Sequence, residues 1–294
     1  MGDYDTLSKY RNCEQDTPFD FKKKSSIGCG GKAKTGFYPK TVEEITNLLN
    51  GLQVDKINYV VVGNMTNVLP PDGAFEKVVV CTKSLKGLAE TPTGVYVKAG
   101  VTSGELLKAC KLLKKSDAEF LEGIPCTIGG ALYMNAGVGG AYIGEIVESV
   151  TVFRNGRIEI LQKEDCKYSY KSSVFMYSDC VILGANLRLT TASEEEIAQK
   201  INYFRDRRAH LPKGKSMGCV FKNPEGYVAG KLIEGVGLKG LRVGGAVVSE
   251  KHANFIINDG LATAEQIKLL IQIIKNAVFA QYKIRLEEEI RYLS

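Results

Sequence analysis

The clearest candidate for chemistry is a thiol in the segment KSMGCVFKNP, residues 215–224. Cys219 follows a glycine and precedes an apolar pair and a Lys-Asn-Pro turn, in a chain with only two histidines. A thiol, with a reference pKa of about 8.5, is a stronger acid than a hydroxyl and can donate a proton. Free cysteine is also among the most buried residue types, so Cys219 could instead be a packing residue. The neighbouring glycine and the polar Lys222-Asn223 flank favour the chemical interpretation.

Glycine-rich segments are the second candidate, because glycine in a strand-to-helix turn lets backbone N–H groups approach a pyrophosphate. Neither G-x-G-x-x-G at the start of a helix nor G-x-x-x-x-G-K-[ST] occurs, which disfavours a Rossmann domain and a P-loop. Isolated glycines can be plain turn residues. Three clusters with polar side chains nearby instead favour one elongated ligand lying across two small α/β units. Those side chains are Asn64, Thr66, Asn67, Thr127 and Asn135.

Composition limits the function classes. A chain of 294 residues, 44% hydrophobic and 24% charged, favours two or three compact domains. The net charge is +6, but the basic residues are scattered except at 22–24 and 205–208, which favours a small anionic ligand over nucleic acid. The eight cysteines include no C-x-x-C pair, so we expect free thiols, no metal site and a reducing cytoplasm. The start is polar and acidic, and no apolar run has transmembrane length, so we expect no secretory leader and no membrane insertion.

Caps and hydrophobic periodicity predict the elements that position these residues. Four helices are predicted, over 41–52, 102–115, from 193, and over 263–282. Strands are predicted at NYVVVG, KVVVC, GVYVKAG, SVTVFRNGRIEILQ and CVILGANLRL, with a tight hairpin at Asn155-Gly156. We therefore expect an α+β protein with three consecutive domains, 1–83, 84–192 and 193–285, and a charged tail, 286–294, that packs back on the second.

Six motifs in order resemble one enzyme family. They are FYPKTVEEI, VGNMTNVL, EGIPCTIGGALYMNAG, GCVFKNP, AGKLIEGVGLKGLRVGGAVVSEKHANFIIN and LEEEIR. The chain is similar to the UDP-N-acetylenolpyruvoylglucosamine reductases, the FAD-dependent UDP-N-acetylmuramate dehydrogenases of bacterial cell-wall synthesis. The short passage between Phe204 and Ser216 resembles their compact subtype, which lacks the extra tyrosine-loop insertion.

The resemblance implies an FAD-binding fold of the vanillyl-alcohol-oxidase type. Its two α/β FAD-binding units would be 1–83 and 84–192, and 193–285 would form a C-terminal α+β substrate-binding domain. It also implies that NADPH reduces bound FAD and leaves, and that the nucleotide-sugar enol ether then receives hydride from flavin N5 and a proton at the neighbouring carbon. A cytoplasmic peptidoglycan precursor enzyme is expected, with a small-molecule partner and a monomer favoured.

The resemblance assigns three catalytic positions. The family's serine corresponds to Cys219, its glutamate to Glu289 and its arginine to Lys171, so two of the three depart from the commonest pattern. Cys219 is then the expected proton donor. Lys171 keeps the positive charge but loses the planar fork that grips a carboxylate, and could instead be a solvated lysine. Glu289 lies in an acidic triplet that could be a solvated face, although Leu286 and Ile290 flank it as apolar anchors.

The binding residues are expected in groups. The cofactor residues are Gly63, Asn64, Met65, Thr66, Asn67, Gly123, Ile124, Pro125, Thr127, Gly129, Gly130, Asn135, Ala136 and Gly137. The substrate residues are Tyr170, Asn223, Lys239, His252 and Asn254, with Tyr133, Arg207 and Arg208 as further candidates. Lys239 could simply decorate a loop, His252 could be a satisfied core histidine, and the tyrosines could be core packing.

Two other functions are compatible with the two departures from the family pattern. One is a diverged flavoprotein oxidoreductase with another substrate. The other is a non-catalytic flavin- or nucleotide-sugar-binding protein.

Overall fold

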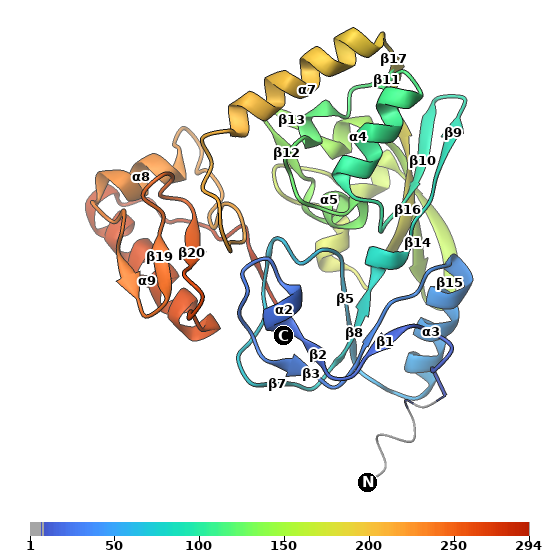
Figure 1. Ribbon diagram of the computed structural model, residues 1–294, viewed down its shortest axis with the longest axis horizontal. Helices are drawn as coiled ribbons and strands as arrows, with labels where there is room; N and C mark the ends of the chain where they lie inside the picture. The colour runs from blue at the N-terminus through green and yellow to red at the C-terminus, as the bar shows by residue number, and fades with distance from the viewer. Residues whose placement is uncertain (1–6, 8, 294) are drawn as a thin grey trace. The chain divides into compact units, whose positions relative to one another are not determined.

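The computed structural model describes residue 7 and residues 9–293. Most of the polar start, residues 1–6 and 8, and the last residue of the tail, 294, lie outside the described residues. Contacts divide the chain into two compact units, each formed from separate stretches of the sequence. Figure 1 labels their main helices and strands. Unit 1 comprises 1–17, 35–64 and 77–209, and unit 2 comprises 18–34, 65–76 and 210–294.

Unit 1 contains a small sheet in the order β1-β4-β8-β5. Its strands are β1 (Gln15–Asp16), β4 (Gly36–Phe37), β8 (Val78–Cys81) and β5 (Tyr59–Val62), with β4, β8 and β5 parallel and β1 antiparallel. The predicted helix is present as α3 (Val42–Val54), which begins where the Thr41 hydroxyl accepts the Glu44 amide at 3.0 Å. The central strand β8 is fully buried, as predicted. The edge strand β5 buries only Val62, because a neighbour covers it on one side alone.

The larger sheet of unit 1 is antiparallel, in the order β15-β14-β16-β10-β9. The strands are β9 (Leu88–Thr91), β10 (Gly94–Lys98), β14 (Val147–Arg154), β15 (Arg157–Gln162) and β16 (Val181–Arg188). The hairpin predicted at Asn155-Gly156 is confirmed: both residues have positive φ, +51° and +77°, as a two-residue turn matching the strand twist requires.

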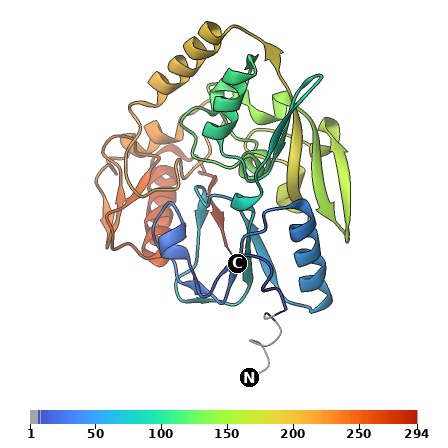
Figure 2. The ribbon, with the colours of Figure 1, turned by 45° about the vertical axis from the view of Figure 1, so that its right-hand side comes forward.

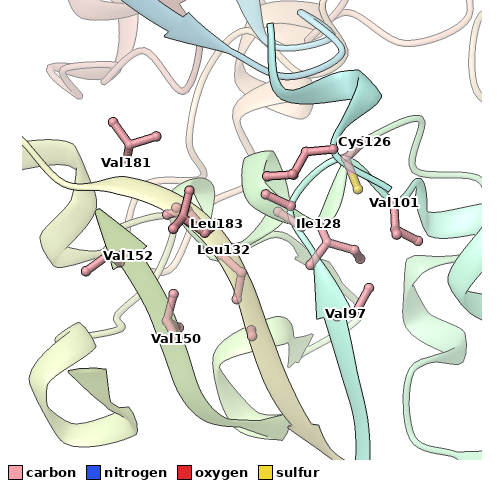
Figure 3. Close-up of a cluster of buried hydrophobic side chains, with 14 of the residues drawn as sticks. Val97, Val101, Cys126, Ile128, Leu132, Val150, Val152, Val181 and Leu183 are labelled. Atoms are coloured by element: carbon pink, nitrogen blue, oxygen red, sulfur yellow. The ribbon is translucent and has the colours of Figure 1, made fainter. Parts of the chain in front are cut away.

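Further helices of unit 1 lie beside the larger sheet. They are α4 (Ser103–Leu112), α5 (Ile128–Met134), α6 (Ile143–Ile146) and α7 (Glu194–Arg208), and the predicted capping boxes are present at Thr102 and Ser193. Figure 3 shows Ile128 and Leu132 of α5 packed among side chains of β10 and β16. α7 lies over α4 (Figure 2). The minor elements are β11 (Lys115–Ser116), β12 (Gly137–Val138), β13 (Ala141–Tyr142), β17 (Thr190–Thr191), η1 (Thr82–Ser84), η2 (Glu119–Leu121), η3 (Lys163–Cys166) and η4 (Val174–Tyr177).

Unit 2 is built from short sheets and two main helices. Its sheets are β2-β3-β7, β18-β19-β20 and the pair β6-β21. The strands are β2 (Phe19–Asp20), β3 (Lys32–Ala33), β6 (Val68–Leu69), β7 (Ala74–Phe75), β18 (Arg242–Val243), β19 (Ala246–Val248), β20 (Ile256–Asn258) and β21 (Arg291–Tyr292). The helices are α2 (Phe21–Lys24), α8 (Ala229–Gly235) and α9 (Ala264–Tyr282). The predicted stripe of α9 is buried against α8, β18 and β19, and comprises Ile267, Leu270, Ile271, Ile274 and Val278.

The domain boundaries differ from the three consecutive stretches expected. The helix from Ser193 belongs to unit 1, whereas 18–34 and 65–76 belong to unit 2, because Ile27, Cys29 and Leu69 are buried in the unit 2 core. The tail, expected to pack on 84–192, is grouped with unit 2. β21 pairs in parallel with β6, and Leu286 and Ile290 enter the unit 2 core. Local patterns do not show this long-range pairing.

Candidate active site

The segment after β5 carries the first group of expected cofactor ligands. It bends at Met65, whose φ of +48° is left-handed and whose carbonyl accepts the amide and hydroxyl of Ser26 at 3.3 and 3.2 Å. Within the described part of the chain, the amides of Asn64, Met65 and Thr66 donate to no protein acceptor. Successive amides around a left-handed residue form a concavity suited to anions. The segment therefore offers the donors that a pyrophosphate needs.

The same segment touches the second group of expected ligands. A Cβ at Gly63 would overlap the Thr127 hydroxyl, so only glycine permits this approach. The Asn64 side-chain amide donates to the Pro125 carbonyl at 2.9 Å. These contacts bring residues 63–64 and 125–127 together, as expected for one ligand-binding surface.

The N-terminus of α5 is not a free anion site. The Ile128 and Gly129 amides donate at 2.8 Å to the carbonyls of residues 101 and 99, and the Thr127 hydroxyl caps the Gly130 amide at 3.4 Å. Gly129 also packs tightly on the residue 99 backbone. The amides of Ile128, Gly129 and Gly130 are therefore already hydrogen-bonded within the protein. The amides of residues 64–66 remain available for a phosphate.

Gly123, Ile124 and the arginines of α7 lie beside this surface. Gly123 has φ +71°, and Arg208 lies against it, so that an added Cβ would meet the guanidinium nitrogen at 3.0 Å. The Ile124 carbonyl accepts the Ser103 hydroxyl at 2.5 Å. Arg207 instead contacts the Tyr203 ring, with its guanidinium carbon 5.5 Å from the centroid. Both arginines therefore lie near the glycine-rich stretch, Arg208 at Gly123 and Arg207 at Gly139, where an added Cβ would be 3.8 Å from the Arg207 Nε.

The third group of expected ligands ends α5. Asn135 is 4% exposed and left-handed, with φ +46°. Its side chain accepts the Gly144 amide at 2.9 Å and donates to the Ser169 carbonyl at 2.8 Å. Ala136 is buried, and a Cβ at Gly137 would overlap the Ala141 carbonyl. The Asn135 side chain is thus engaged inside the protein.

Lys171 lies at the tip of a tight turn in unit 1. Ser169 and Ser172 exchange amide–carbonyl hydrogen bonds, both 3.1 Å long, which leaves Tyr170 and Lys171 as the two loop residues. Lys171 has φ +52°. The Tyr170 ring is half-exposed and meets Tyr142 edge-on, with centroids 6.2 Å apart. The turn presents both residues at the surface of unit 1.

Tyr133 is connected to the same turn through its backbone. Its carbonyl accepts the hydroxyl of the buried Ser173 at 2.6 Å. The Tyr133 side chain is partly buried against the unit 1 core, so packing accounts for part of its surface.

In unit 2 the segment 219–222 runs between two others. Cys219 pairs with Phe255 on one side, and Phe221 pairs with Glu288 of the tail on the other. The Glu289 amide donates to the Val220 carbonyl at 2.8 Å. The structure thus places Cys219 and Glu289, which are far apart in the sequence, on adjacent hydrogen-bonded segments.

The acidic triplet does not behave as one solvated face. Glu287 forms an ion pair with Lys222 at 2.5 Å, and Glu288 with Lys275 at 2.7 Å. Glu289 is half-buried, and its carbonyl accepts the Asn67 side chain at 3.0 Å. The apolar anchors Leu286 and Ile290 are buried as expected. Asn67, expected to bind the cofactor, therefore fixes the segment that carries Glu289.

The expected substrate residues of unit 2 divide into buried and exposed ones. Asn254 is 3% exposed, and its side chain bonds both backbone groups of Phe221, accepting from N–H at 2.9 Å and donating to C=O at 2.8 Å. Asn223 is exposed and accepts the Ala229 amide at 3.0 Å, at the start of α8. Lys239 forms an ion pair with Glu234 at 2.6 Å.

His252 is half-buried beside these residues. Its Nδ1 accepts the Asn254 amide at 3.3 Å, and its ring stacks on His210 with centroids 6.4 Å apart. Burial, and then the neighbouring His210, hold the pKa of His252 below its ordinary value. The lowered pKa favours the neutral ring, and because Nδ1 accepts a hydrogen bond, the proton of that neutral ring is on Nε2.

The thiols differ in exposure. Burial raises the pKa of the Cys126 thiol to about 11 and that of Cys110 to about 12, so both are inert packing residues. Cys219 and Cys180 are only partly buried, and none of the eight cysteines, all of which lie in the described part of the chain, forms a disulfide. Among the cysteines, Cys219 alone combines partial exposure with the position next to Glu289.

Neither a metal centre nor a membrane-spanning helix is found among the described residues. Residues 7 and 9–293 contain no group of three or more His, Cys, Asp or Glu side chains placed to hold a metal ion. None of the helices described is both long enough and apolar enough to cross a membrane.

Comparison with known families defines the class first: residues 34–161 match an FAD binding domain, so the chain contains an FAD-binding module. Residues 209–293 match the C-terminal domain of UDP-N-acetylenolpyruvoylglucosamine reductase. The reductase of that name from Caldanaerobacter subterraneus subsp. tengcongensis is 36% identical over 92% of this chain and 90% of its own length. The chain belongs to the UDP-N-acetylenolpyruvoylglucosamine reductase family. It is an FAD-dependent oxidoreductase, which confirms the predictions of family, enzyme class and FAD.

Solved structures agree. The crystal structure of UDP-N-acetylenolpyruvylglucosamine reductase from Thermus caldophilus matches 96% of this chain and 99% of its own, with a TM-score of 0.82 and 31% identity. A solvent-stable cholesterol oxidase matches 62% of this chain and 38% of its own at a TM-score of 0.50 and 15% identity, a likeness of fold alone. The predicted α+β fold with an FAD-binding module of the vanillyl-alcohol-oxidase type is confirmed.

Some residues that build the site were not singled out in the sequence. Ser173 and Ser169 attach the Lys171 turn to the end of α5. The only local signal was the run of serines in YSYKSS, which is typical of any turn.

Proposed function

We propose that this chain reduces UDP-N-acetylglucosamine enolpyruvate to UDP-N-acetylmuramate with NADPH, in peptidoglycan precursor synthesis, and that Cys219 supplies the proton. The observation that carries the proposal is the backbone pairing of unit 2, where the Glu289 amide donates to Val220, the residue after Cys219. Family membership supports the substrate. The partly exposed thiol supports the proton donor.

The residues present fit an FAD. The free amides of residues 64–66, the Gly63–Thr127 contact and Arg208 beside Gly123 supply donors and positive charge for a pyrophosphate. When bound and reduced by NADPH, FAD would supply a hydride from N5 to the terminal carbon of the enolpyruvyl group.

Cys219 would then complete the reduction. Hydride addition to the methylene carbon leaves an electron pair on the carbon that bears the carboxylate. The thiol proton moves to that carbon, a C–H bond forms, and the thiolate that remains is reprotonated from solvent. General acid catalysis of this kind contributes about 10²- to 10⁴-fold in rate.

Glu289 and Lys171 have supporting roles in the proposal. Lys171 offers a positive charge for the substrate carboxylate, as a point charge without the bidentate grip of an arginine. Glu289 polarises the substrate near the protonated carbon. The neighbouring Glu287 and Glu288 form ion pairs with Lys222 and Lys275.

The nucleotide-sugar residues are proposed in unit 2 and the Lys171 turn. His252 donates from a neutral ring, and Lys239 and Asn223 offer a cation and an amide for the diphosphate. Tyr170 is a surface contact at the turn. Asn254 acts by holding Phe221, and through it the Cys219 segment. We also propose a cytoplasmic monomer, testable by cell fractionation and light scattering.

Replacing Cys219 tests the proton donor. Stopped-flow flavin absorbance follows the reduction by NADPH and the reoxidation by the enolpyruvyl nucleotide as separate half-reactions. Cys219→Ala should slow only reoxidation, by about 10²- to 10⁴-fold, whereas Cys219→Ser should retain most of it. The matched control is Cys180→Ala, which removes the other partly buried thiol and should leave both half-reactions unchanged. Reoxidation of Cys219→Ala at the normal rate would show that the donor lies elsewhere.

A diverged oxidoreductase with another substrate is the second candidate, because Cys219 and Lys171 stand where the family has serine and arginine. It predicts that the NADPH-reduced wild type is not reoxidised by UDP-N-acetylglucosamine enolpyruvate. Turnover with that substrate would remove this alternative.

A further inference from the structure

The Lys171 turn is attached to the rest of unit 1 at both of its stems. On one stem, the Ser169 carbonyl accepts the Asn135 side-chain amide at 2.8 Å. On the other, the Ser173 hydroxyl donates to the Tyr133 carbonyl at 2.6 Å. Both partners lie at the C-terminal end of α5, so the end of one short helix fixes the turn.

Asn135 is suited to this attachment by its backbone as well as its side chain. Its φ of +46° and ψ of +56° are left-handed, a conformation that asparagine tolerates better than most residues. The side chain is 4% exposed and both ends of its amide are used, because Oδ1 also accepts the Gly144 amide at 2.9 Å. A buried amide with both ends paired has one orientation, so it holds Ser169 at a defined place.

The turn itself is exposed and needs an anchor. Tyr170 is half-exposed and Lys171 is partly exposed, and two-residue loops of polar residues gain little from burial. The cross-turn hydrogen bonds between Ser169 and Ser172 fix the shape of the turn but not its place relative to α5. The Asn135 and Ser173 hydrogen bonds set that place.

We propose that Asn135 is a positioning residue for Lys171, the assignment resting on the proposed function of Lys171 as the cation for the substrate carboxylate. Asn135 holds the Ser169 stem against the end of α5 and thereby sets where the Lys171 ammonium stands. This role goes beyond the cofactor contact expected for Asn135. Misplacement of a catalytic group by about 1 Å can cost on the order of 10²-fold in rate.

The test uses Asn135→Asp, which keeps the oxygen that accepts from Gly144 and replaces the donor to Ser169 with a second acceptor. The matched control is Asn186→Asp, which removes an asparagine donor to the Ser149 hydroxyl elsewhere in unit 1. The first readout does not depend on activity. Loosening of the turn should speed trypsin cleavage after Lys171 at least tenfold, and raise deuterium exchange over residues 169–172, in Asn135→Asp but not in Asn186→Asp. Equal protection of Lys171 in Asn135→Asp and wild type would overturn the attachment.

The second readout is a double-mutant cycle on reoxidation by the enolpyruvyl nucleotide. Asn135→Asp should slow reoxidation at least tenfold in the wild-type background and by less than twofold in Lys171→Ala, because the residue acts through Lys171. Equal losses in both backgrounds would overturn the positioning role. FAD affinity, measured by flavin fluorescence, should be unchanged, and a parallel loss of FAD would make Asn135 a cofactor ligand instead. Failure of wild-type turnover would refute the proposed function, whereas the trypsin result would still decide the attachment.

Discussion

The segment that carries Cys219 depends on one buried asparagine, and Asn254→Ala is the sharpest test of that dependence. The Asn254 side chain is 3% exposed and makes two hydrogen bonds, 2.9 and 2.8 Å, to the amide and carbonyl of Phe221. Alanine removes both hydrogen-bonding partners of Phe221. The amide and carbonyl of that residue, which is only 1% exposed, are then left without a hydrogen bond.

The magnitude follows from those two groups. An unsatisfied buried donor or acceptor costs about 1–3 kcal/mol, so two of them should lower the free energy of unfolding by about 2–6 kcal/mol. That is a large part of the roughly 5–15 kcal/mol by which proteins are stable. In a unit of about 110 residues, about 1 kcal/mol corresponds to roughly 4 °C in the melting temperature, so the expected decrease is on the order of 10–20 °C.

Thermal unfolding followed by circular dichroism measures the effect. Asn276→Ala is the control, because Asn276 is an exposed residue of α9 whose side chain accepts a hydrogen bond from Gln272 on the same helix. Its melting temperature should change by about 2 °C or less, since surface substitutions away from such features cost less than about 0.5 kcal/mol. If the melting temperature of Asn254→Ala equals that of the control, then water or a local shift supplies hydrogen bonds to the Phe221 amide and carbonyl. Asn254 would then not fix the Cys219 segment.

Two further predictions concern unit 1. Gly137→Ala should lower the flavin content of the purified protein, measured by absorbance, because the added Cβ would overlap the Ala141 carbonyl in the β12–β13 hairpin. Gly104→Ala is the control and should retain full flavin, because no atom lies within 4 Å of its added Cβ. Burial alone would raise the pKa of Glu105, but hydrogen bonds from Lys86 and Thr102 lower it to about 2. The contribution of Glu105 to stability is therefore complete above pH 4.5 and is lost as pH falls toward 2. In Glu105→Gln the free energy of unfolding, measured by urea titration, should depend less on pH over that range. Because the Glu105 side chain is 51% exposed, the contribution is small, and an unchanged acid profile would contradict it.

Local physical chemistry allowed much of the fold to be predicted. The helix starts at Thr41, Thr102, Ser193 and Thr263 depend on caps and apolar stripes a few residues long. The Asn155-Gly156 hairpin depends on two residues that tolerate positive φ. Such signals lie within one turn or one strand, so the sequence carries them whole. The order of six motifs likewise predicted the family, which the comparisons confirmed.

The candidate site could be predicted only in part. Cys219 and Glu289 were named from the resemblance, but their adjacency comes from the bond between the Glu289 amide and Val220. Asn67, Asn135 and Asn254 were expected to bind ligands. In the structure the side-chain amide of each donates a hydrogen bond to a backbone carbonyl of a distant segment. An amide has the same chemistry whether it faces a ligand or the chain, so the residue type does not distinguish the two.

The sequence by itself determined the elements, the FAD-binding class and the enzyme family, because capping, periodicity and motif order are properties of short contiguous stretches. Only the tertiary structure decided that 18–34 and 65–76 belong with the C-terminal residues, and that the tail pairs with β6. Those arrangements depend on hydrogen bonds and buried contacts between segments about two hundred residues apart, such as Asn258 to the Ile27 carbonyl at 2.8 Å, with a separation of 231. Such pairing is selected by the free energy of the whole core, and no local pattern encodes it.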